Sequence, residues 1–550
     1  MEKRIEQILT ELVSMKSLTC SEKEREPAQW FVDFFRSLPY FQSHPEDTGA
    51  YAIPNDPYER IVPYALLRGR RPDTVVLSGH FDVVSSEEYG AAEPYAYQPG
   101  GGELEKLLTD FPLDEAQRRD LESGEWLWGR GVADMKGGLS IHAALFERCA
   151  EQAEAGELEG SLLFVPVPVP DEESYSAGMR GAVEILRTLQ QKYGLIYKLL
   201  IDPEPTRLVD GAQIFSLGSV GKVMPVILVQ AKKAHAGRCY EGFSALNVLA
   251  DIYLRTNGSL AFSDVYGDEA TVPPTWARLR DRKEGYDVSI PHRAGGYFTA
   301  LSFSSTPEDM EEKLKRICTE AFLAQVEKLD REYQRFKTMN QAERQEHLHY
   351  EPCVMSFHEL CELLRSRDRD GFERFYADAY RRTAESVSAG AASYPDATLA
   401  FMEETLNYSD IQYPVTLIGF APPYYPPVHS DHIRGKEGYG SKALAYTAER
   451  SEKDFGQRVR PENYFMGISD LSYGAVTAPF NYEKLSENMP LWGDAYRINF
   501  DAMEQIGIPS VIYGPIGREY HTYAERVNKH SLYHVVPAVT RALIEYMWTV

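Results

Sequence analysis

The 550-residue sequence predicts an α/β protein in which a mostly parallel sheet is flanked by helices and interrupted by an inserted α+β domain and an extra helical segment. Three observations lead to this prediction. The first part of the chain alternates short apolar runs with helical patterns, which is typical of a parallel sheet. The pattern changes at residues 214–235 to two strand-like runs around Gly221. Residues 310–411 are mostly helical and highly charged, and the strand–helix alternation resumes after them.

The elements of the first part follow one another closely along the chain. The first nineteen residues place apolar side chains at helical spacing among charges, which predicts an amphipathic helix rather than a signal peptide. A strand, a helix, a strand, a helix and a strand are then expected in that order, at residues 74–84, 137–156, 161–167, 182–194 and 197–205.

The length of the chain favours more than one domain. The simplest organisation is a single α/β domain that the chain leaves and later re-enters. We expect its two parts at residues 1–212 and 412–550, a separate α+β domain at 213–325 and a helical insertion at 326–411. A helix is expected at residues 244–256, inside the α+β domain.

The composition disfavours several classes of protein. The formal net charge of −24 argues against binding to nucleic acid, because phosphate groups attract a basic surface. No apolar stretch is long enough to span a bilayer, so we expect no membrane association. The six cysteines are scattered and form no CxxC pair. They indicate free thiols in a reducing cytoplasm rather than a disulfide framework or a thiolate zinc site.

Candidate metal ligands recur where the predicted strands end, which is where open α/β sheets bind their ligands. These residues are His80, Asp82, Asp134, Glu172, Glu173, Asp202, Glu204 and His521. Each of them alone is an ordinary residue for a turn or a strand end. Together, two histidines and three or four carboxylates suit a site for two ions of zinc, cobalt or manganese, with a bridging carboxylate and an open position for water.

One strand ends in an unusual way. Residues 161–174 read SLLFVPVPVPDEES, so that Pro166, Pro168 and Pro170 alternate before three consecutive carboxylates. The three prolines have the same parity, and their missing N–H groups therefore lie on one side of an extended strand. Central strands rarely tolerate this. We expect a gap or bulge in the ladder on one side of residues 165–170.

The motifs GHFDVV, GRGVADMKGG, PDEES, EPT, AHAG, GISD and H-x3-E occur in this order. This ordered set resembles the M20 family of dinuclear zinc hydrolases, which includes carboxypeptidases, aminoacylases and deacylating enzymes. The resemblance implies a zinc-exopeptidase-like catalytic domain with an inserted lid domain. The long helical stretch after the lid resembles the RocB-type branch of this family, which is linked with arginine utilisation.

The resemblance also implies a role for each motif residue. His80 and Glu204 would hold one metal ion, Glu173 and His521 the other, and Asp134 would bridge the two, with Asp202 as a possible substitute for Glu204. Glu172 would act as the general base and Asp82 would orient His80. His235 of AHAG would stabilise the oxyanion, in this family often across a dimer interface, and residues 213 to about 325 would form the dimerising lid.

Two features limit what the resemblance implies. The strand TALSFSS in the expected lid has no arginine where small-substrate enzymes of the family grip a carboxylate, so substrate recognition is open. The segment HSDH at residues 429–432 repeats a histidine–aspartate pattern after a turn-rich stretch, and we expect an exposed loop there.

Two functions are compatible with the motifs. The first is a cytoplasmic metallohydrolase that cleaves a small amide, such as an N-acyl amino acid or a short peptide, in arginine-related catabolism. The second is a catalytically silent family member that acts by binding or regulation. The intact base and the five ligand positions favour the enzyme.

Overall fold

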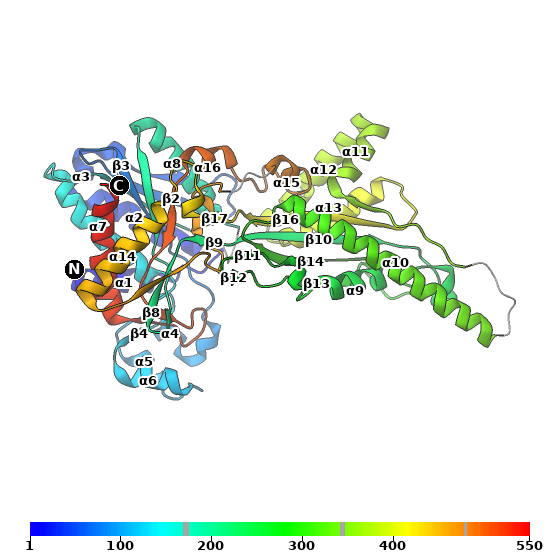
Figure 1. Ribbon diagram of the computed structural model, residues 1–550, viewed down its shortest axis with the longest axis horizontal. Coiled ribbons are helices and arrows are strands. Elements are labelled where there is room, and N and C mark those ends of the chain that lie inside the picture. Colours follow the sequence, from blue (N-terminus) through cyan, green and yellow to red (C-terminus); the bar gives the residue numbers. More distant parts are fainter. Residues whose placement is uncertain (169–174, 341–346, 478–480) are drawn as a thin grey trace. The chain divides into compact units, whose positions relative to one another are not determined.

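The computed structural model describes residues 1–168, 175–340, 347–477 and 481–550. The chain forms two compact units (Figure 1). The first unit comprises Met1–Val220, Pro426–Ala478 and Ile498–Val550, and the second comprises Gly221–Tyr425 and Pro479–Arg497. Residues 481–497 therefore belong to the second unit, although they follow the return of the chain to the first.

A nine-stranded mixed sheet forms the centre of the first unit, in the order β1-β2-β5-β3-β6-β19-β8-β18, with β7 paired to β8. The strands are β1 (Thr48–Ala52), β2 (Ile61–Leu67), β3 (Asp73–His80), β5 (Ser161–Val167), β6 (Ile196–Asp202), β7 (Leu208–Val209), β8 (Ala212–Ser216), β18 (Val459–Glu462) and β19 (Ser510–Ile512). The central strands β5, β3, β6 and β19 run parallel to one another, whereas β1 and β2 add antiparallel pairs at one edge. The predicted α/β class is confirmed.

Helices cover both faces of this sheet, as a central parallel sheet requires. The helices of the first unit are α1 (Glu2–Ser14), α2 (Arg25–Ser37), α3 (Pro39–Ser43), α4 (Glu93–Ala96), α5 (Glu103–Leu108), α6 (Glu115–Ser123), α7 (Lys136–Glu154), α8 (Ala177–Tyr193), α14 (Tyr439–Phe455), α16 (Phe500–Ile506) and α17 (Val536–Met547). On one face, Val75 and Leu77 of β3 join the main core with Phe146 of α7. On the other face, the Ser78 hydroxyl contacts the Met179 sulfur of α8.

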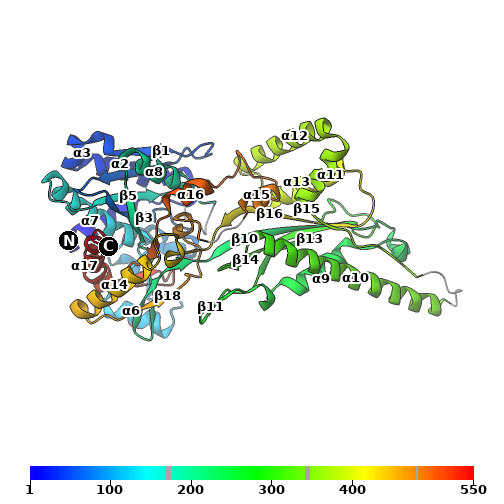
Figure 2. The ribbon, with the colours of Figure 1, turned by 45° about the horizontal axis from the view of Figure 1, so that its top comes forward.

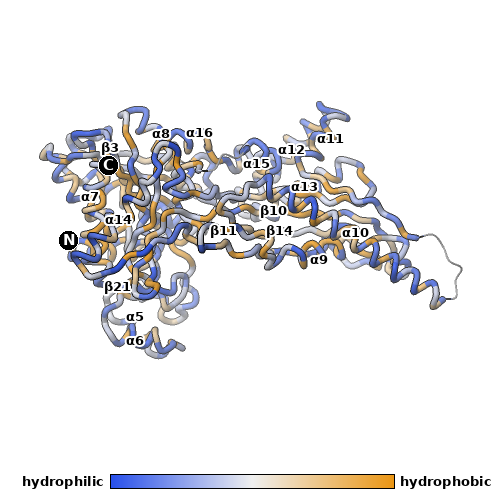
Figure 3. Tube along the Cα trace, viewed as in Figure 1, coloured by the Kyte–Doolittle hydropathy of each residue, from blue (hydrophilic) through white to orange (hydrophobic). Residues whose placement is uncertain are grey.

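Two small sheets complete the first unit. One joins β4 (Trp126–Trp128), β21 (Arg526–Asn528) and β20 (Gly517–Arg518), and the other joins β9 (Gly218–Ser219) to β17 (Val428–His429). The helix α6 has no buried residue, and the α5–α6 region is largely hydrophilic along its trace (Figure 3). No helix among the described residues has the length and apolar character to cross a membrane.

The ladder beside the prolines is open on one side. Strand β5 pairs with β3 up to Val167, but its pairing with β2 stops at Phe164. If the β2 register continued, Pro63 would lie opposite Pro166, and neither residue has an N–H group to donate. The predicted one-sided gap is confirmed for residues 165–167, and Pro170 lies outside the described residues.

The second unit is built on a five-stranded sheet in the order β13-β14-β10-β16-β15. Its strands are β10 (Gly221–Gln230), β13 (Thr275–Asp281), β14 (Arg293–Ser302), β15 (Val354–Ser356) and β16 (Val415–Tyr425), and a separate hairpin joins β11 (Val265–Tyr266) to β12 (Glu269–Ala270). Its helices are α9 (Ala245–Thr256), α10 (Pro307–Met339), α11 (Phe357–Arg367), α12 (Arg369–Ser388), α13 (Tyr394–Tyr408) and α15 (Tyr482–Glu487). Helices α9 and α10 lie on one face of this sheet and α11–α13 on the other (Figure 2).

The helical segment after α10 is an integral part of the second unit. Val226 and Leu228 of β10 form a core with Leu360 of α11 and Met402 of α13. The segment after residue 480 joins the same unit, because the Phe420 N–H donates to the carbonyl of Asn488 (2.9 Å). The insertion therefore covers a sheet face that would otherwise expose apolar side chains.

Candidate metal centre

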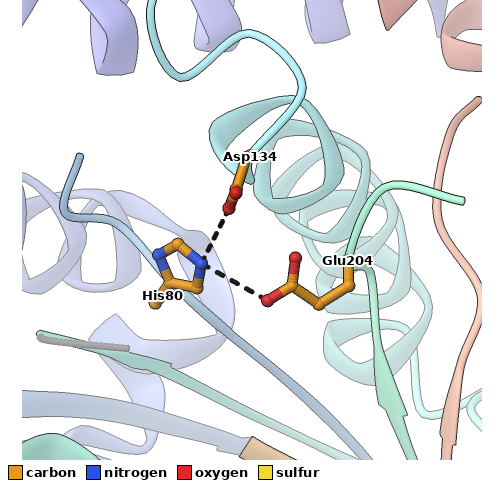
Figure 4. A group of neighbouring side chains, drawn as sticks. All are labelled: His80, Asp134 and Glu204. Atoms are coloured by element: carbon orange, nitrogen blue, oxygen red, sulfur yellow. Dashed lines mark ion pairs between the residues drawn. The ribbon is translucent and has the colours of Figure 1, made fainter. Parts of the chain in front are cut away.

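Three predicted ligands converge beyond the carboxyl ends of β3 and β6. His80 is the last residue of β3, Glu204 follows β6 by two residues, and Asp134 lies in the turn before α7. The Nε2 atom of His80 is 3.1 Å from Asp134 Oδ1 and 3.4 Å from Glu204 Oε1 (Figure 4). All three side chains are buried, and one ligand atom from each lies within 4.8 Å of the others. This spacing allows a single cation to contact all three.

The opposite nitrogen of His80 faces Asp82. The distance from Nδ1 to Asp82 Oδ1 is 3.3 Å, so Asp82 is placed to fix the ring orientation while Nε2 points into the group. Burial opposes a positive charge on His80, but the hydrogen bonds with Asp134, Asp82 and Glu204 outweigh it and raise the pKa well above the usual value. A cation at the group would take the place of that proton.

Asp134 connects the two predicted histidine ligands. Its Oδ1 faces His80 and its Oδ2 is 3.1 Å from the Nε2 atom of His521. Burial favours the neutral acid, but the hydrogen bonds from His521 and His80 outweigh it and hold the pKa of Asp134 below its usual range. The His521 side chain is 42% exposed, against 5% for His80. An ionised Asp134 can therefore present one oxygen to each histidine.

Two further buried carboxyl groups lie close to this group. Asp202 and Asp470 are nearly inaccessible to solvent, and none of their carboxylate oxygens has a hydrogen-bond partner among the described residues. Burial, together with Glu204 and Asp470, raises the pKa of Asp202. The pKa of Asp470 rises to about 7, mainly because of burial. Glu204 and Asp82 raise this pKa further, whereas His80 lowers it.

Asp470 is the residue that the sequence reasoning left without a role. It closes the GISD motif, which contributed to the family resemblance only as a pattern. The signal was therefore present, but nothing in the sequence places residue 470 beside residues 80 and 204. Asp202, in contrast, was considered as an alternative to Glu204. The structure includes Glu204 and not Asp202 in the three-residue group.

The remaining predicted residues lie in different places. Glu172 and Glu173 fall outside the described residues. His235 belongs to the second unit, is exposed, and accepts a hydrogen bond from the Gly237 N–H at its Nδ1 atom (3.0 Å).

The expectation of an exposed loop at HSDH is wrong for its first two residues. His429 and Ser430 are buried. His429 pairs with Gly218 in a short sheet, and the Ser430 hydroxyl donates to the carbonyl of Ser510 (2.5 Å). Backbone pairing across the chain, which the local turn-rich sequence does not reveal, explains the difference.

The residues present fit a divalent cation. Imidazole and carboxylate groups are the donors that zinc, manganese and cobalt accept. Buried carboxylates without partners are costly unless a positive charge compensates them. In the first unit, this description applies to Asp202 and Asp470, whose oxygens lack hydrogen bonds in the described part of the chain.

Comparison with known proteins gives a consistent result. The family described as peptidase family M20/M25/M40 matches residues 76–545. The chain is 29% identical to YqjN of Bacillus subtilis (strain 168) over 96% of its length and 94% of that protein. It is 26% identical to RocB of the same organism, over 97% of this chain and 93% of that protein.

Solved structures with the same fold have much lower identity. A tripeptidase from Staphylococcus aureus has a TM-score of 0.52 at 15% identity and covers 100% of this chain and 99% of its own. The Bacillus subtilis YXEP protein, described as a dinuclear metal-binding peptidase of the M20 family, has a TM-score of 0.50 at 10% identity, with 100% and 99% covered. These likenesses concern the fold.

Proposed function

Since the chain belongs to peptidase family M20/M25/M40 and is a hydrolase of peptide or other C–N bonds, we propose that it cleaves the amide bond of an N-acyl amino acid or a short peptide. The cleavage depends on two divalent metal ions, with zinc as the first candidate and cobalt or manganese as alternatives. The observation that supports this best is the position of Asp134, which has one carboxylate oxygen beside His80 and the other beside His521.

The ligands divide into two sets that share Asp134. His80 and Glu204 would hold one ion, and His521 would hold the other together with Glu173. When bound, two such ions supply Lewis-acid polarisation of the amide carbonyl and lower the pKa of water. Asp82 keeps the His80 ring oriented through its contact with Nδ1 (3.3 Å).

The remaining roles belong to residues that handle protons and charge. Glu172 takes the proton of the attacking water and returns it to the leaving nitrogen. His235 donates a hydrogen bond to the carbonyl oxygen as negative charge develops there. Residues 213 to about 325 act as a lid, and a homodimer formed through this lid would bring in His235 from a second copy.

The substrate is proposed to be an arginine-related amide in the cytoplasm. The full-length similarity to RocB supports this class, because the name of that branch is linked with arginine utilisation. The segment TALSFSS, which begins in β14, contains no arginine that could hold a substrate carboxylate. A panel that includes arginine- and ornithine-derived amides is therefore the informative choice.

The first prediction concerns Glu172. Glu172→Gln removes the proton acceptor and keeps the shape, so it should bind metal as the wild type does and lose at least about 100-fold in turnover. The measurement is metal content together with the release of free amine from the amide panel. A Glu172→Gln protein with full turnover would contradict the role of the general base.

The same panel separates the enzyme from the silent family member. The wild-type protein should bind about two ions and release amine from at least one panel compound. Bound metal without turnover on any compound would favour a binding or regulatory protein. Asp47→Asn provides a matched control, because Asp47 is a buried carboxylate that pairs with Arg68 and takes no part in the metal group.

A further inference from the structure

A second buried cluster lies beside the metal group and has no role in the proposed chemistry. Its centre is the ion pair of Arg130 and Glu525, whose side chains are each 1% exposed. Arg130 Nη1 donates to Glu525 Oε2 at 2.7 Å. A buried ion pair is weak evidence for stability by itself, because the cost of removing both charges from water offsets much of their attraction. The contacts of this pair with the neighbouring loops suggest a different use.

Glu525 holds the backbone directly before the bridging carboxylate. Its Oε1 atom accepts hydrogen bonds from the N–H groups of Ala133 and Asp134, both at 3.2 Å. Two donors on consecutive residues fix the orientation of the intervening peptide group. The Asp134 side chain leaves the chain at this point, so Glu525 sets the direction from which it reaches His80 and His521.

The same pair joins the other two ligand-bearing segments. Glu525 lies four residues after His521, and its carbonyl accepts the Gly129 N–H at 3.2 Å. Arg130 Nη2 donates to the carbonyl of Ser85 at 3.1 Å and also contacts Glu88, in the segment that follows His80 and Asp82. The segments that carry His80, Asp134 and His521 therefore meet at one buried ion pair.

We propose that the Arg130–Glu525 pair is a positioning device that holds Asp134 as the bridge between His80 and His521, and thereby sets the affinity for the metal ion on the His521 side. The proposal rests on the proposed two-metal function. The ion on the His80 side depends less on the pair, because His80 is fixed at the end of a central strand and contacts Glu204 independently. The ion on the His521 side depends on the relative position of two loops.

The test measures metal binding by the full-length protein rather than turnover. Equilibrium dialysis with Co²⁺ gives the number of ions per chain and the affinity of each, and the absorption spectrum of the bound Co²⁺ identifies the site. Glu525→Ala should keep the first ion with nearly wild-type affinity and weaken the second by about 10- to 100-fold, the range expected for groups that orient a metal ligand. The lost ion should be the one that His521→Ala also loses.

A matched variant separates positioning from stability. Asp47→Ala also removes a buried carboxylate that pairs with an arginine, since Asp47 Oδ2 lies 2.7 Å from Arg68 Nε, but it should leave both affinities unchanged. Glu525→Gln retains an oxygen that can accept from Ala133 and Asp134, so its second affinity should lie between those of the wild type and Glu525→Ala. If Glu525→Ala does not fold, the test rests on Glu525→Gln, which should bind the second ion more weakly than the wild type does.

The outcomes distinguish this inference from the proposed function. If the wild type binds two ions and the folded Glu525 variants bind both with wild-type affinity, the pair does not position Asp134 and the inference is wrong. If the wild type binds fewer than two ions, the two-metal function itself fails. A loss of affinity at both sites in Glu525→Ala and Asp47→Ala alike would show a general effect of destabilisation, which also overturns the inference.

Discussion

His142 shows how a residue outside the metal group can govern the response of the protein to acid. It lies on α7, is fully buried, and its Nδ1 atom is 3.2 Å from the carbonyl oxygen of Ser78. Burial lowers its pKa to about 3, although the hydrogen bond to Ser78 acts in the opposite direction. The ring is therefore neutral in the folded state at every pH at which the protein is expected to work.

The consequence is a loss of stability on acidification. Below the unfolded-state pKa of about 6.5, His142 binds a proton in the unfolded chain but stays neutral in the folded protein. Its contribution to the free energy of unfolding is therefore present above that pH and is lost as the pH decreases toward 3. Between pH 7 and 5 this amounts to about 2 kcal/mol. His142→Asn keeps a hydrogen-bond donor to the Ser78 carbonyl but cannot be protonated. Between pH 7 and 5 its free energy of unfolding should therefore fall by about 2 kcal/mol less than that of the wild type. Urea unfolding of both proteins at the two pH values measures the difference, and equal losses would refute it.

At the scale of residues, the sequence predicted which residues form the metal group better than it predicted which residues are buried beside them. His80, Asp134 and Glu204 were predicted from motifs, and the structure brings them together. Asp470 was missed because its importance lies in burial beside residues distant in sequence, and no local pattern reports burial. His429 was misjudged for the same reason, since its partner strand lies about two hundred residues away.

At the scale of elements, one buried lysine holds the C-terminal end of α1, whose apolar face packs into the main core. Lys136 is completely buried, and its ammonium group donates to the carbonyls of Leu12 (2.9 Å) and Met15 (2.7 Å) at the C-terminal end of α1. A cation at that end adds a donor to carbonyl groups that also accept the Met15 and Ser17 N–H groups, and it interacts favourably with the helix dipole.

Lys136→Met should therefore loosen the C-terminal end of α1. The substitution removes two buried hydrogen bonds from a charged donor, although the Leu12 and Met15 carbonyls keep the Met15 and Ser17 N–H groups, and we expect it to destabilise the protein by about 3 kcal/mol. Hydrogen exchange should increase across Glu2–Ser14 more than in α8. Lys16→Met is the control, because Lys16 is 43% exposed and its pair with Glu93 should contribute less than about 1 kcal/mol. Unchanged exchange in α1 would contradict the attachment.

Elements with strong local patterns were the ones predicted well. The expected helix at 244–256 corresponds to Ala245–Thr256, and the expected strand at 161–167 to Ser161–Val167. The alternating prolines also predicted the part of β5 at which its pairing with β2 ends. The pairing of Val354–Ser356 with β16 was not predictable, because a three-residue strand carries no periodic signal and is defined by its partner.

At the scale of the whole molecule, the sequence predicted a chain that leaves one α/β unit and returns to it. It did not predict a second excursion at residues 479–497. This segment belongs to the second unit through contacts such as the hydrogen bond between the Tyr424 N–H and the Tyr496 hydroxyl (3.0 Å). Such contacts depend on complementary surfaces formed by distant parts of the chain, which neither composition nor periodicity encodes.

The accumulation of buried acids in the first unit has a consequence for the entire protein when metal is removed. In the metal-free state, burial raises the pKa of Asp202, of Glu204 and, to about 7, of Asp470, and hydrogen bonds to carboxylates raise that of His80 against the effect of burial. Each of these groups binds protons more tightly in the folded state than in the unfolded state. Their contribution to stability is therefore present below the unfolded-state pKa and is lost as the pH rises through the folded-state value.

Metal removal should consequently destabilise the protein more at pH 8 than at pH 5.5. Bound cations need deprotonated ligands and compensate the carboxylates, so binding strengthens as the pH rises while the metal-free protein weakens. We expect the difference in melting temperature between the metal-loaded and the chelator-treated protein to be larger at pH 8 by more than about 3 °C. His142 does not contribute, because its effect is the same in both states. Asp470→Asn should reduce the pH dependence of the chelated protein, whereas a difference in melting temperature that is equal at the two pH values would show that the buried acids are not compensated by metal.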